Sequence, residues 1–359
     1  MSWLLVLFGF ALLVVLHELG HFSVAKLVGM RVEKFSLFFP PTLFSRKVGE
    51  TEYAIGAIPA GGYVKISGMN PDEELPEEVR DRAYHAQPVW KRIAVIAAGP
   101  GVNLVLALVL LFTFFWAIGP ETSSSRVGAT DKGYPAATAL KPGDKVISVD
   151  GIRGGPEKLS PQIAKHRCAQ TPPTKGCEAA TPAKLVVKRD GERRRVSLRP
   201  IYDPANDRTR LGFAYAPGPR ETLGPGRALS VSLDRFWFIT KQTVSVPAKI
   251  FNPQQRKEIS GVVGISKVAS DTIQSNIADA VQLLALVSLS LAIVNLFPFL
   301  PLDGGHIFWA VVEKLRRRPV PLAVMERAGV VGFMLVIGLF VLGLTNDIGR
   351  LTGEGFQVR

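Results

Sequence analysis

The sequence predicts a membrane protein that is mainly α-helical, with four transmembrane helices, a membrane-associated β-hairpin loop and an extracytoplasmic α+β domain. Three observations predict this class. Apolar residues are concentrated in four long blocks, the short loops beside these blocks are basic, and a charged region rich in strand and turn signals separates the second block from the third. Hydrophobic residues make up 47% of the 359 residues, which fits membrane spans combined with an aqueous module.

The four blocks cover residues 3–25, 93–118, 280–302 and 328–344. The second is uncharged over 26 residues and the third over 23, so both are long enough to cross a bilayer. The fourth has 17 residues and is expected to include neighbours at its ends. In the first block, residues 3–16 rise only about 21 Å as a helix, so a spanning helix must continue to about Ala25.

The first block could alternatively be a signal peptide that is removed. Only Met1 and Ser2 precede the apolar run, so the basic n-region is missing, and no small-residue cleavage site follows. We therefore expect a retained transmembrane helix.

Basic residues in the short loops predict the orientation. Residues 31–92 contain nine Lys/Arg and residues 302–327 contain five, whereas the N-terminal tail has none. The positive-inside rule then makes both loops cytoplasmic. Both termini and residues 119–279 are expected on the extracytoplasmic side of a bacterial inner membrane.

The net charge of +13 is unevenly distributed. Residues 119–279 contain 26 Lys/Arg and 15 Asp/Glu, a surplus of 11, which leaves 2 for the rest of the chain. We expect no nucleic-acid partner. The surplus favours attraction to anionic lipid headgroups, envelope polymers or an acidic partner, and an ordinary solvated surface is the alternative.

His17, Glu18 and His21 form an H-E-x-x-H motif directly behind the apolar run. At helical spacing the two imidazoles lie on one face and can hold one zinc ion, while Glu18 lies beside them as a general base. A pair of structural core histidines is the alternative. It explains less, because an ionisable Glu at the apolar centre of a helix is costly and needs a compensating role.

Catalytic zinc typically takes three protein ligands, so a third is needed. Asp303 is the main candidate, because Pro and Gly break the helix around it and irregular backbone at membrane depth must be buried or line a wet cavity. His306 competes for this role. Helix capping or a simple loop boundary is the other interpretation of Asp303.

A strand-like segment precedes the second block. Residues 53–55 and 63–65 flank Pro59, Ala60, Gly61 and Gly62, which predicts a hairpin over residues 51–65 whose edge receives an unwound substrate. The candidate substrate-binding residues are Tyr63, Val64, Gly61, Gly62 and Asn295. An ordinary cytoplasmic loop is the alternative for the hairpin, and packing between helices is the alternative for Asn295 and Asn103.

The extracytoplasmic region divides into two parts. Short strand-like runs end in Asp150-Gly151 and Asp190-Gly191, which mark hairpins. Residues 133–151 resemble the central segment of a PDZ domain, which implies a PDZ-like domain that binds a peptide ligand. The expected boundaries are 1–118 for the first two helices and the β-loop, 119–205 for the PDZ-like domain, 206–279 for an amphipathic linker and 280–359 for the last two helices.

Cys168 and Cys177 are the only cysteines, and both lie in this region. Oxidising conditions there predict a disulfide that closes a short loop, with free thiols as the alternative.

His17–His21 (H-E-L-G-H), residues 302–305 (L-D-G-G) and the PDZ-like insert together resemble the site-2 protease family of intramembrane zinc metalloproteases, and within it the bacterial RseP-like group with one PDZ domain. Residues 50–69, 87–103 and 260–266 resemble the family's β-loop, second-helix motif and segment before the third helix. Two departures occur. Val262 replaces a usual proline, and Pro301 lies one position late.

The resemblance implies that His17, His21 and Asp303 bind zinc, with Glu18 as the base. It also implies cleavage of pre-trimmed single-span membrane proteins, such as anti-sigma factors or remnant signal peptides, within the lipid bilayer. A proteolytically inactive PDZ-bearing scaffold with structural zinc is the alternative, although a structural site needs no general base. A zinc-dependent transporter is a weaker alternative, because the blocks offer few charges.

Overall fold

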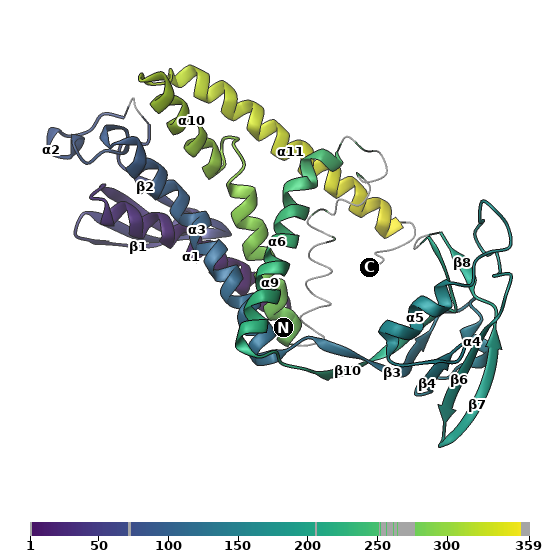
Figure 1. The fold of residues 1–359 in the computed structure, drawn as a ribbon. Helices are drawn as coiled ribbons and strands as arrows, with labels where there is room; N and C mark the ends of the chain where they lie inside the picture. Colours follow the sequence, from purple (N-terminus) through teal and green to yellow (C-terminus); the bar gives the residue numbers. More distant parts are fainter. Residues whose placement is uncertain are drawn as a thin grey trace. The chain divides into compact units, whose positions relative to one another are not determined.

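The computed structural model describes residues 2–70, 73–204, 207–250, 252, 256, 261, 264 and 277–352 (Figure 1). The chain forms two compact units. One combines Met1–Ala117 with Gly224–Arg359, and the other is Ile118–Leu223. Val262 and most of residues 260–266, the segment expected to precede the third helix, lie outside the described residues.

The first unit is mainly helical and also contains one β-hairpin. Its described α-helices are α1 (Ser2–Leu27), α2 (Glu77–Arg80), α3 (Val89–Thr113), α6 (Pro225–Lys249), α9 (Ile277–Asn295), α10 (Asp303–Arg316) and α11 (Leu322–Thr352). Within the described residues, four stretches of helix could cross a membrane by length and composition: Phe8–Leu27, Val89–Ile118, Ala278–Asn295 and Ala323–Gly349. The fourth apolar block therefore extends well beyond the predicted 17 residues. The predicted amphipathic linker, residues 206–279, contains helix α6.

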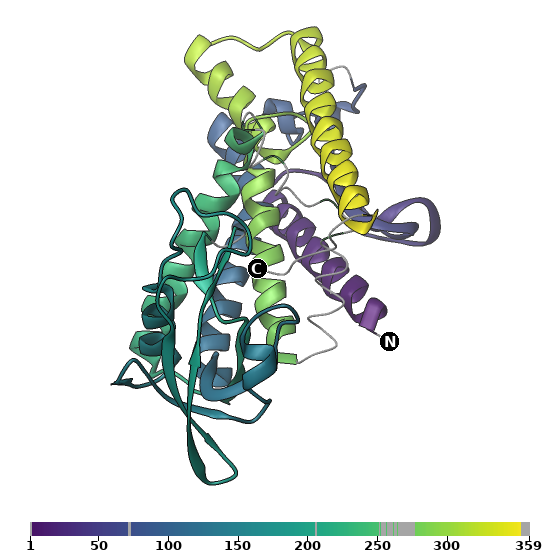
Figure 2. The ribbon, with the colours of Figure 1, turned by 90° about the vertical axis from the view of Figure 1, so that its right-hand side faces the viewer.

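Helix α3 contacts more of this unit than any other described helix, because α1, α6, α9 and α10 all pack on it (Figures 1 and 2). Ala107 of α3, Ile239 of α6 and Leu289 of α9 are buried in one apolar cluster. Helix α11 differs, because Val330, Phe333 and other large apolar side chains along it are exposed. Such a surface is expected to face lipid.

The predicted hairpin over residues 51–65 is wrong in its pairing. Strand β1 (Val32–Val48) forms a hairpin with β2 (Thr51–Ile66), and the turn lies between Val48 and Thr51. Phe35 pairs with both Tyr53 and Val64, so the two halves of β2 each pair with β1 instead of with one another. Residues 53–55 and 63–65 are neighbouring strand-like runs in the sequence, whereas the segment that pairs with both, residues 32–48, lies earlier in the chain and was not predicted as a strand.

The base of this hairpin is fixed by apolar packing. Met30, Val32 and Ile66 are buried together with Ala25 of α1 and Val95 of α3. The second half of β2 is thereby held against both helices, and its remaining edge has no further strand partner among the described strands.

The second unit, Ile118–Leu223, is a mixed α+β domain. It contains β3 (Glu121–Thr130), α4 (Ala136–Ala139), β4 (Lys145–Val149), β5 (Ile152–Arg153), α5 (Pro156–Ala164), β6 (Ala183–Arg189), β7 (Glu192–Leu198), β8 (Ile201–Asp203), β9 (Arg208–Arg210) and β10 (Phe213–Arg220). The main sheet has the order β10-β3-β4-β6-β7, with β5 paired to β4, and β8 pairs with β9. Leu159 and Ile163 of α5 pack on one face of the sheet.

The Asp-Gly turns are confirmed. Asp150 and Gly151 have φ values of 50° and 83°, and Asp190 and Gly191 have φ values of 51° and 87°. These left-handed conformations match the two-residue turn that joins twisted antiparallel strands.

This unit extends beyond the predicted boundary at residue 205. β10 pairs with β3 at the other end of the domain, with Phe213 opposite Thr130. The sheet thus includes residues that were predicted to belong to the linker. A strand that pairs with a segment far back along the chain carries no local signal of its partner, so the sequence did not indicate this boundary.

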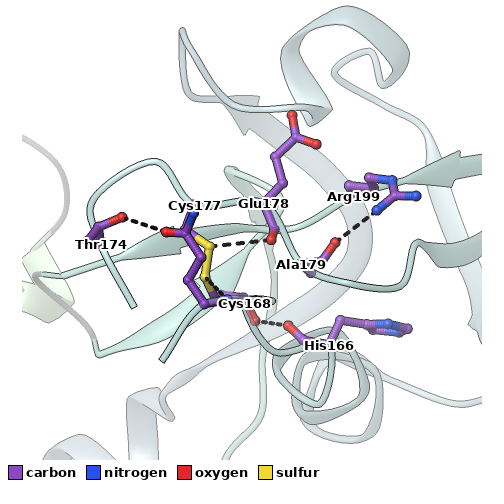
Figure 3. Close-up of a disulfide and its surroundings, with 9 residues drawn as sticks. His166, Cys168, Thr174, Cys177, Glu178, Ala179 and Arg199 are labelled. Atoms are coloured by element: carbon purple, nitrogen blue, oxygen red, sulfur yellow. Dashed lines mark hydrogen bonds between the residues drawn. A yellow bond between two sulfur atoms is a disulfide. The ribbon is translucent and has the colours of Figure 1, made fainter. Parts of the chain in front are cut away.

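The structure joins Cys168 and Cys177 by a disulfide whose Cα atoms are 5.9 Å apart (Figure 3). The bond closes a loop beside the bridge that pairs Cys168 with Ala179. The Arg199 guanidinium donates to the Ala179 carbonyl at 3.2 Å.

Candidate metal centre and active site

The two imidazoles of the H-E-x-x-H motif come from consecutive turns of α1. His17 and His21 are only 6% and 7% exposed. They are buried against α3, and Gly20 allows this close approach: a Cβ there would lie 2.7 Å from the carbonyl oxygen of Ala98. The glycine inside the motif is therefore required by helix packing.

Asp303, the first residue of α10, meets both histidines. Its Oδ2 lies 3.1 Å from His17 Nε2 and 3.4 Å from His21 Nε2. The two Nε2 atoms are 3.2 Å apart. Among the described residues, these three form the group of possible metal ligands whose atoms all lie within 4.8 Å of one another. His306 does not belong to this group.

The donor set fits zinc. Ligand atoms about 2.0–2.1 Å from a tetrahedral zinc lie roughly 3.3 Å from one another, and the three observed separations are close to this value. Two imidazole nitrogens and one carboxylate oxygen are also the ligand types of catalytic zinc sites, which leave the fourth position open.

Both histidines have further contacts that orient their rings. His21 Nδ1 donates to the carbonyl oxygen of Val95 at 2.8 Å. This hydrogen bond leaves Nε2 deprotonated and able to bind metal.

His17 has a side-chain neighbour in α3. Asn103 Nδ2 lies 3.3 Å from His17 Nδ1, and Asn103 is fully buried. Asn103 Oδ1 has no hydrogen-bond partner within the described part of the chain. Turning the amide by 180° exchanges these atoms, so that Oδ1 accepts the Nδ1–H of a His17 that binds metal through Nε2.

Two glycine positions shape the pocket around the ligands. A Cβ at Gly99 of α3 would overlap the His21 imidazole, so this ring fits only because Gly99 has no side chain. A Cβ at Gly305 of α10 would lie 2.5 Å from the backbone nitrogen of Leu300. Gly305 therefore lets the start of α10, and Asp303 with it, pack against the preceding turn.

Glu18 faces the edge of β2. A Cβ at Gly62 would lie 3.1 Å from Glu18 Cγ, and Glu18 and Val64 line the same cavity. Gly62 and Val64 pair with Leu37 and Phe35 of β1, and this half of β2 has no second strand partner among the described strands.

A cavity of about 420 Å³ connects these groups. It is lined by His17, Glu18, His21 and Asp303 together with the five candidate substrate-binding residues, Gly61, Gly62, Tyr63, Val64 and Asn295. Apolar side chains, including Phe10, Val14 and Leu291, complete the wall. Asn103 is not part of this lining, and it contacts His17 instead.

Three supporting features of the site were not predicted from the sequence. Val95 and Gly99 act through a carbonyl oxygen and a missing side chain, which no motif of reactive residues identifies. Arg92 donates two hydrogen bonds to Glu313 of α10, at 3.0 and 2.6 Å, and so joins α3 to the helix that begins at Asp303. In the sequence, the only indication of this ion pair was that Arg92 and Glu313 each lie close to a predicted transmembrane span.

Comparison with known proteins agrees with this geometry. The family model for peptidase family M50 matches residues 5–339. The chain is 31% identical over 369 residues to a protein of Brucella suis that is described as a zinc metalloprotease, and the match covers 95% of this chain and 93% of the relative.

The chain is also 31% identical over 407 residues to the zinc metalloprotease Rip1 of Mycobacterium tuberculosis, with 96% of each chain covered. A similar protein of Xylella fastidiosa, also described as a zinc metalloprotease, is 28% identical over 442 residues, with 96% of this chain and 98% of the relative covered. The chain therefore belongs to peptidase family M50, the site-2 protease family, and is a zinc metalloprotease.

Proposed function

We propose that this protein hydrolyses peptide bonds within the transmembrane segments of other proteins, with His17, His21 and Asp303 as the zinc ligands and Glu18 as the general base. The observation that carries the proposal is the convergence of the three ligand atoms within 4.8 Å, next to helices long and apolar enough to cross a membrane. Both histidines belong to such a helix.

The chemistry divides between metal and protein. When bound, zinc supplies a Lewis acid that polarises the scissile carbonyl and lowers the pKa of a water molecule. Glu18 takes a proton from the attacking water and delivers it to the leaving amine. Val95 and Asn103 keep the two imidazoles in the orientation that directs Nε2 at the metal.

The unpaired edge of β2 is proposed to receive the substrate. A transmembrane helix must lose its internal hydrogen bonds before it can be cut, and an added strand regains them along a free sheet edge. Gly61–Val64 line the cavity beside Glu18, and Asn295 lies at the end of α9 on the same cavity. A substrate paired with this edge would bring its backbone to the metal.

The proposed substrates are single-span membrane proteins whose outer portion has been trimmed, such as anti-sigma factors or remnant signal peptides. Unit Ile118–Leu223 is proposed to be a PDZ-like domain that selects substrates through a peptide ligand. We further propose an inner-membrane location with both termini and this domain extracytoplasmic, and with the site near the cytoplasmic surface.

The test uses the purified full chain in detergent or lipid, a model single-span substrate and the variant Glu18→Gln. We expect cleavage to fall by at least roughly 10²-fold, because the proton acceptor is lost, while bound zinc remains near the wild-type content. A Glu18→Gln variant that cleaved the substrate at the wild-type rate would contradict the role of Glu18 as the general base.

The inactive-scaffold alternative gives a different result. A scaffold with structural zinc would bind zinc in the wild type yet cut no transmembrane substrate, and Glu18→Gln would change nothing. Zinc content measured beside cleavage therefore separates loss of chemistry from loss of the metal.

A further inference from the structure

One face of the sheet in the Ile118–Leu223 unit carries four cationic side chains in direct register. Arg126 of β3 lies opposite Lys145 of β4, Lys145 lies opposite Lys188 of β6, and Lys188 lies opposite Arg193 of β7. We call these four residues the basic row. Residues directly opposite one another in a sheet share a face, so the row crosses four strands.

The row lies on the face away from the core. Val127, Val146 and Val187 follow or precede row residues in their strands, and all three are buried against α5. Because successive side chains alternate between faces, the row points the other way. All four row residues are exposed.

The same face carries further positive charge. Arg153, Lys184 and Arg195 share it, through the pairs Ser148–Arg153, Lys184–Ser197 and Val186–Arg195. Glu121 of β3 and Glu192 of β7 are the acidic residues of these two strands. By strand alternation their side chains point to the opposite face from the row, and they form ion pairs with Arg220 and Arg194.

No carboxylate compensates the basic row within the described part of the chain. None of its four side chains forms an ion pair there, and the Arg126 guanidinium donates instead to the Gly143 carbonyl at 3.2 Å. Like charges directly opposite one another destabilise a sheet. A set of like charges that lowers the stability of the sheet and has no counter-charge nearby is expected at a site where an external ligand supplies the counter-charge.

We propose that the basic row is a docking surface for the phosphate groups of anionic lipids in the membrane that this chain spans. Adjacent strands are about 4.8 Å apart, so the row forms a nearly flat line of charge roughly 14 Å long. Such a line is complementary to a plane of headgroups, whereas a compact anion would contact only one or two of its members.

Chain connectivity favours lipid over a soluble polyanion. The candidate span Val89–Ile118 ends three residues before β3, and Arg126 is eight residues beyond Ile118. Eight residues reach at most roughly 29 Å when fully extended. The tether therefore keeps the row at high effective concentration near the headgroups, where each cation strengthens association by about fivefold.

The experiment uses the full chain with Ser197→Cys on the same face, labelled with an environment-sensitive fluorophore. The chain has two cysteines and both form the disulfide, so the new thiol is labelled selectively. Labelled protein is placed in nanodiscs of neutral phosphatidylcholine, or of phosphatidylcholine mixed with phosphatidylglycerol. We expect bilayer-borne quenchers to reach the label more in the anionic nanodiscs, and high salt to remove the difference.

Lys188→Glu tests the row itself. It puts an opposite charge between Lys145 and Arg193, so we expect higher thermal stability together with lipid docking weakened by roughly 25-fold. A purely structural role would not move these two readouts in opposite directions. Lys158→Glu is the control. Lys158 is an exposed residue of α5, which covers the other face of the sheet, so this substitution changes the net charge equally and should leave docking intact.

Three outcomes would overturn the proposal. One is equal quenching in neutral and anionic nanodiscs. The second is equal loss of docking in Lys158→Glu and Lys188→Glu, which would indicate a general charge effect. The third is a response in neutral nanodiscs to added soluble polyphosphate as large as the response to phosphatidylglycerol, which would identify a soluble polyanion as the partner.

Discussion

His17 Nε2 and Asp303 Oδ2 lie 3.1 Å apart, although 286 positions separate the two residues in the chain. Helix α3 makes this meeting possible, because both α1 and α10 pack on it. The candidate metal centre therefore depends on three helices, of which only two supply ligands.

Replacing Asp303 tests the ligand set. Asp303→Asn keeps the shape of the side chain and removes the anionic oxygen, so we expect zinc affinity to fall by more than the roughly 10–100-fold typical of changes to groups that support the ligands. Zinc content by mass spectrometry measures this. His306→Gln is the control and should retain zinc, and the opposite pattern would identify His306 as the ligand.

Asn103→Leu tests the partner of His17. The substitution removes the acceptor for the His17 Nδ1–H, and we expect zinc affinity to fall by roughly 10–100-fold. Ser288→Ala is the matched control, because Ser288 Oγ donates to the backbone carbonyl of Asn103 and does not reach the histidine. Equal effects of the two substitutions on competition with a metal chelator would argue against this role.

Gly99→Ala tests the space for His21. The added methyl group overlaps the imidazole, so we expect weaker zinc binding and lower cleavage. Gly101→Ala lies two residues later in the same helix and meets nothing within 4 Å. It should stabilise the protein by about 0.5–1 kcal/mol through the better helix propensity of Ala. Thermal unfolding with zinc analysis distinguishes the two, and a Gly99→Ala protein with normal zinc content would refute the steric argument.

Arg92→Met tests the link between α3 and α10. It leaves the Glu313 carboxylate without its two hydrogen bonds from Arg92, and we expect a loss of roughly 1–3 kcal/mol of stability together with weaker zinc retention. The double variant with Glu313→Gln should lose less than the sum of the single variants, which a double-mutant cycle measures. If the stability losses of the two single variants were strictly additive, the interaction between Arg92 and Glu313 would contribute nothing to stability. Lys314→Met, exposed on the same helix, is the control.

Acid should weaken the hairpin through Glu50. Two hydrogen bonds from Arg82 and one from Lys26, each 2.8–2.9 Å long, lower the pKa of Glu50 to about 2. A carboxyl whose pKa is depressed in the folded state contributes stability above its unfolded pKa of about 4.5 and loses it as the pH falls towards 2.

After allowance for solvent screening, we expect this contribution to be about 1 kcal/mol. Glu50→Gln should be less stable than wild type at neutral pH, and the difference should shrink between pH 5 and pH 2 in thermal unfolding. Glu78→Gln, an exposed change in α2, should run parallel to wild type throughout. A constant gap between Glu50→Gln and wild type would show that protonation of Glu50 is not responsible.

Local pattern was sufficient for several parts of the molecule. The length of the apolar blocks predicted helices of spanning length, and the Asp-Gly pairs predicted the turns of the β4–β5 and β6–β7 hairpins. In both cases the determining physics acts over a few residues: helix periodicity over a bilayer thickness, and the left-handed conformation of a two-residue turn.

The pairing of β2 could not be predicted in this way. Tyr53 and Val64 both pair with Phe35, so the strand between them in space comes from an earlier part of the chain. Strand partners separated in sequence are selected by burial of a shared face, and here Val32 and Ile66 supply that face against α1 and α3.

The sequence by itself determined that two histidines one turn apart, with an adjacent glutamate, occupy an apolar helix, because four-residue spacing fixes a common helical face. Only the tertiary structure decided that Asp303 and not His306 reaches them, that Gly99 leaves room for the His21 ring, and that the edge of β2 lies beside Glu18. These relationships depend on the rotation and depth at which α1, α3 and α10 pack. Contacts between side chains far apart in the chain set that packing, and no local pattern encodes it.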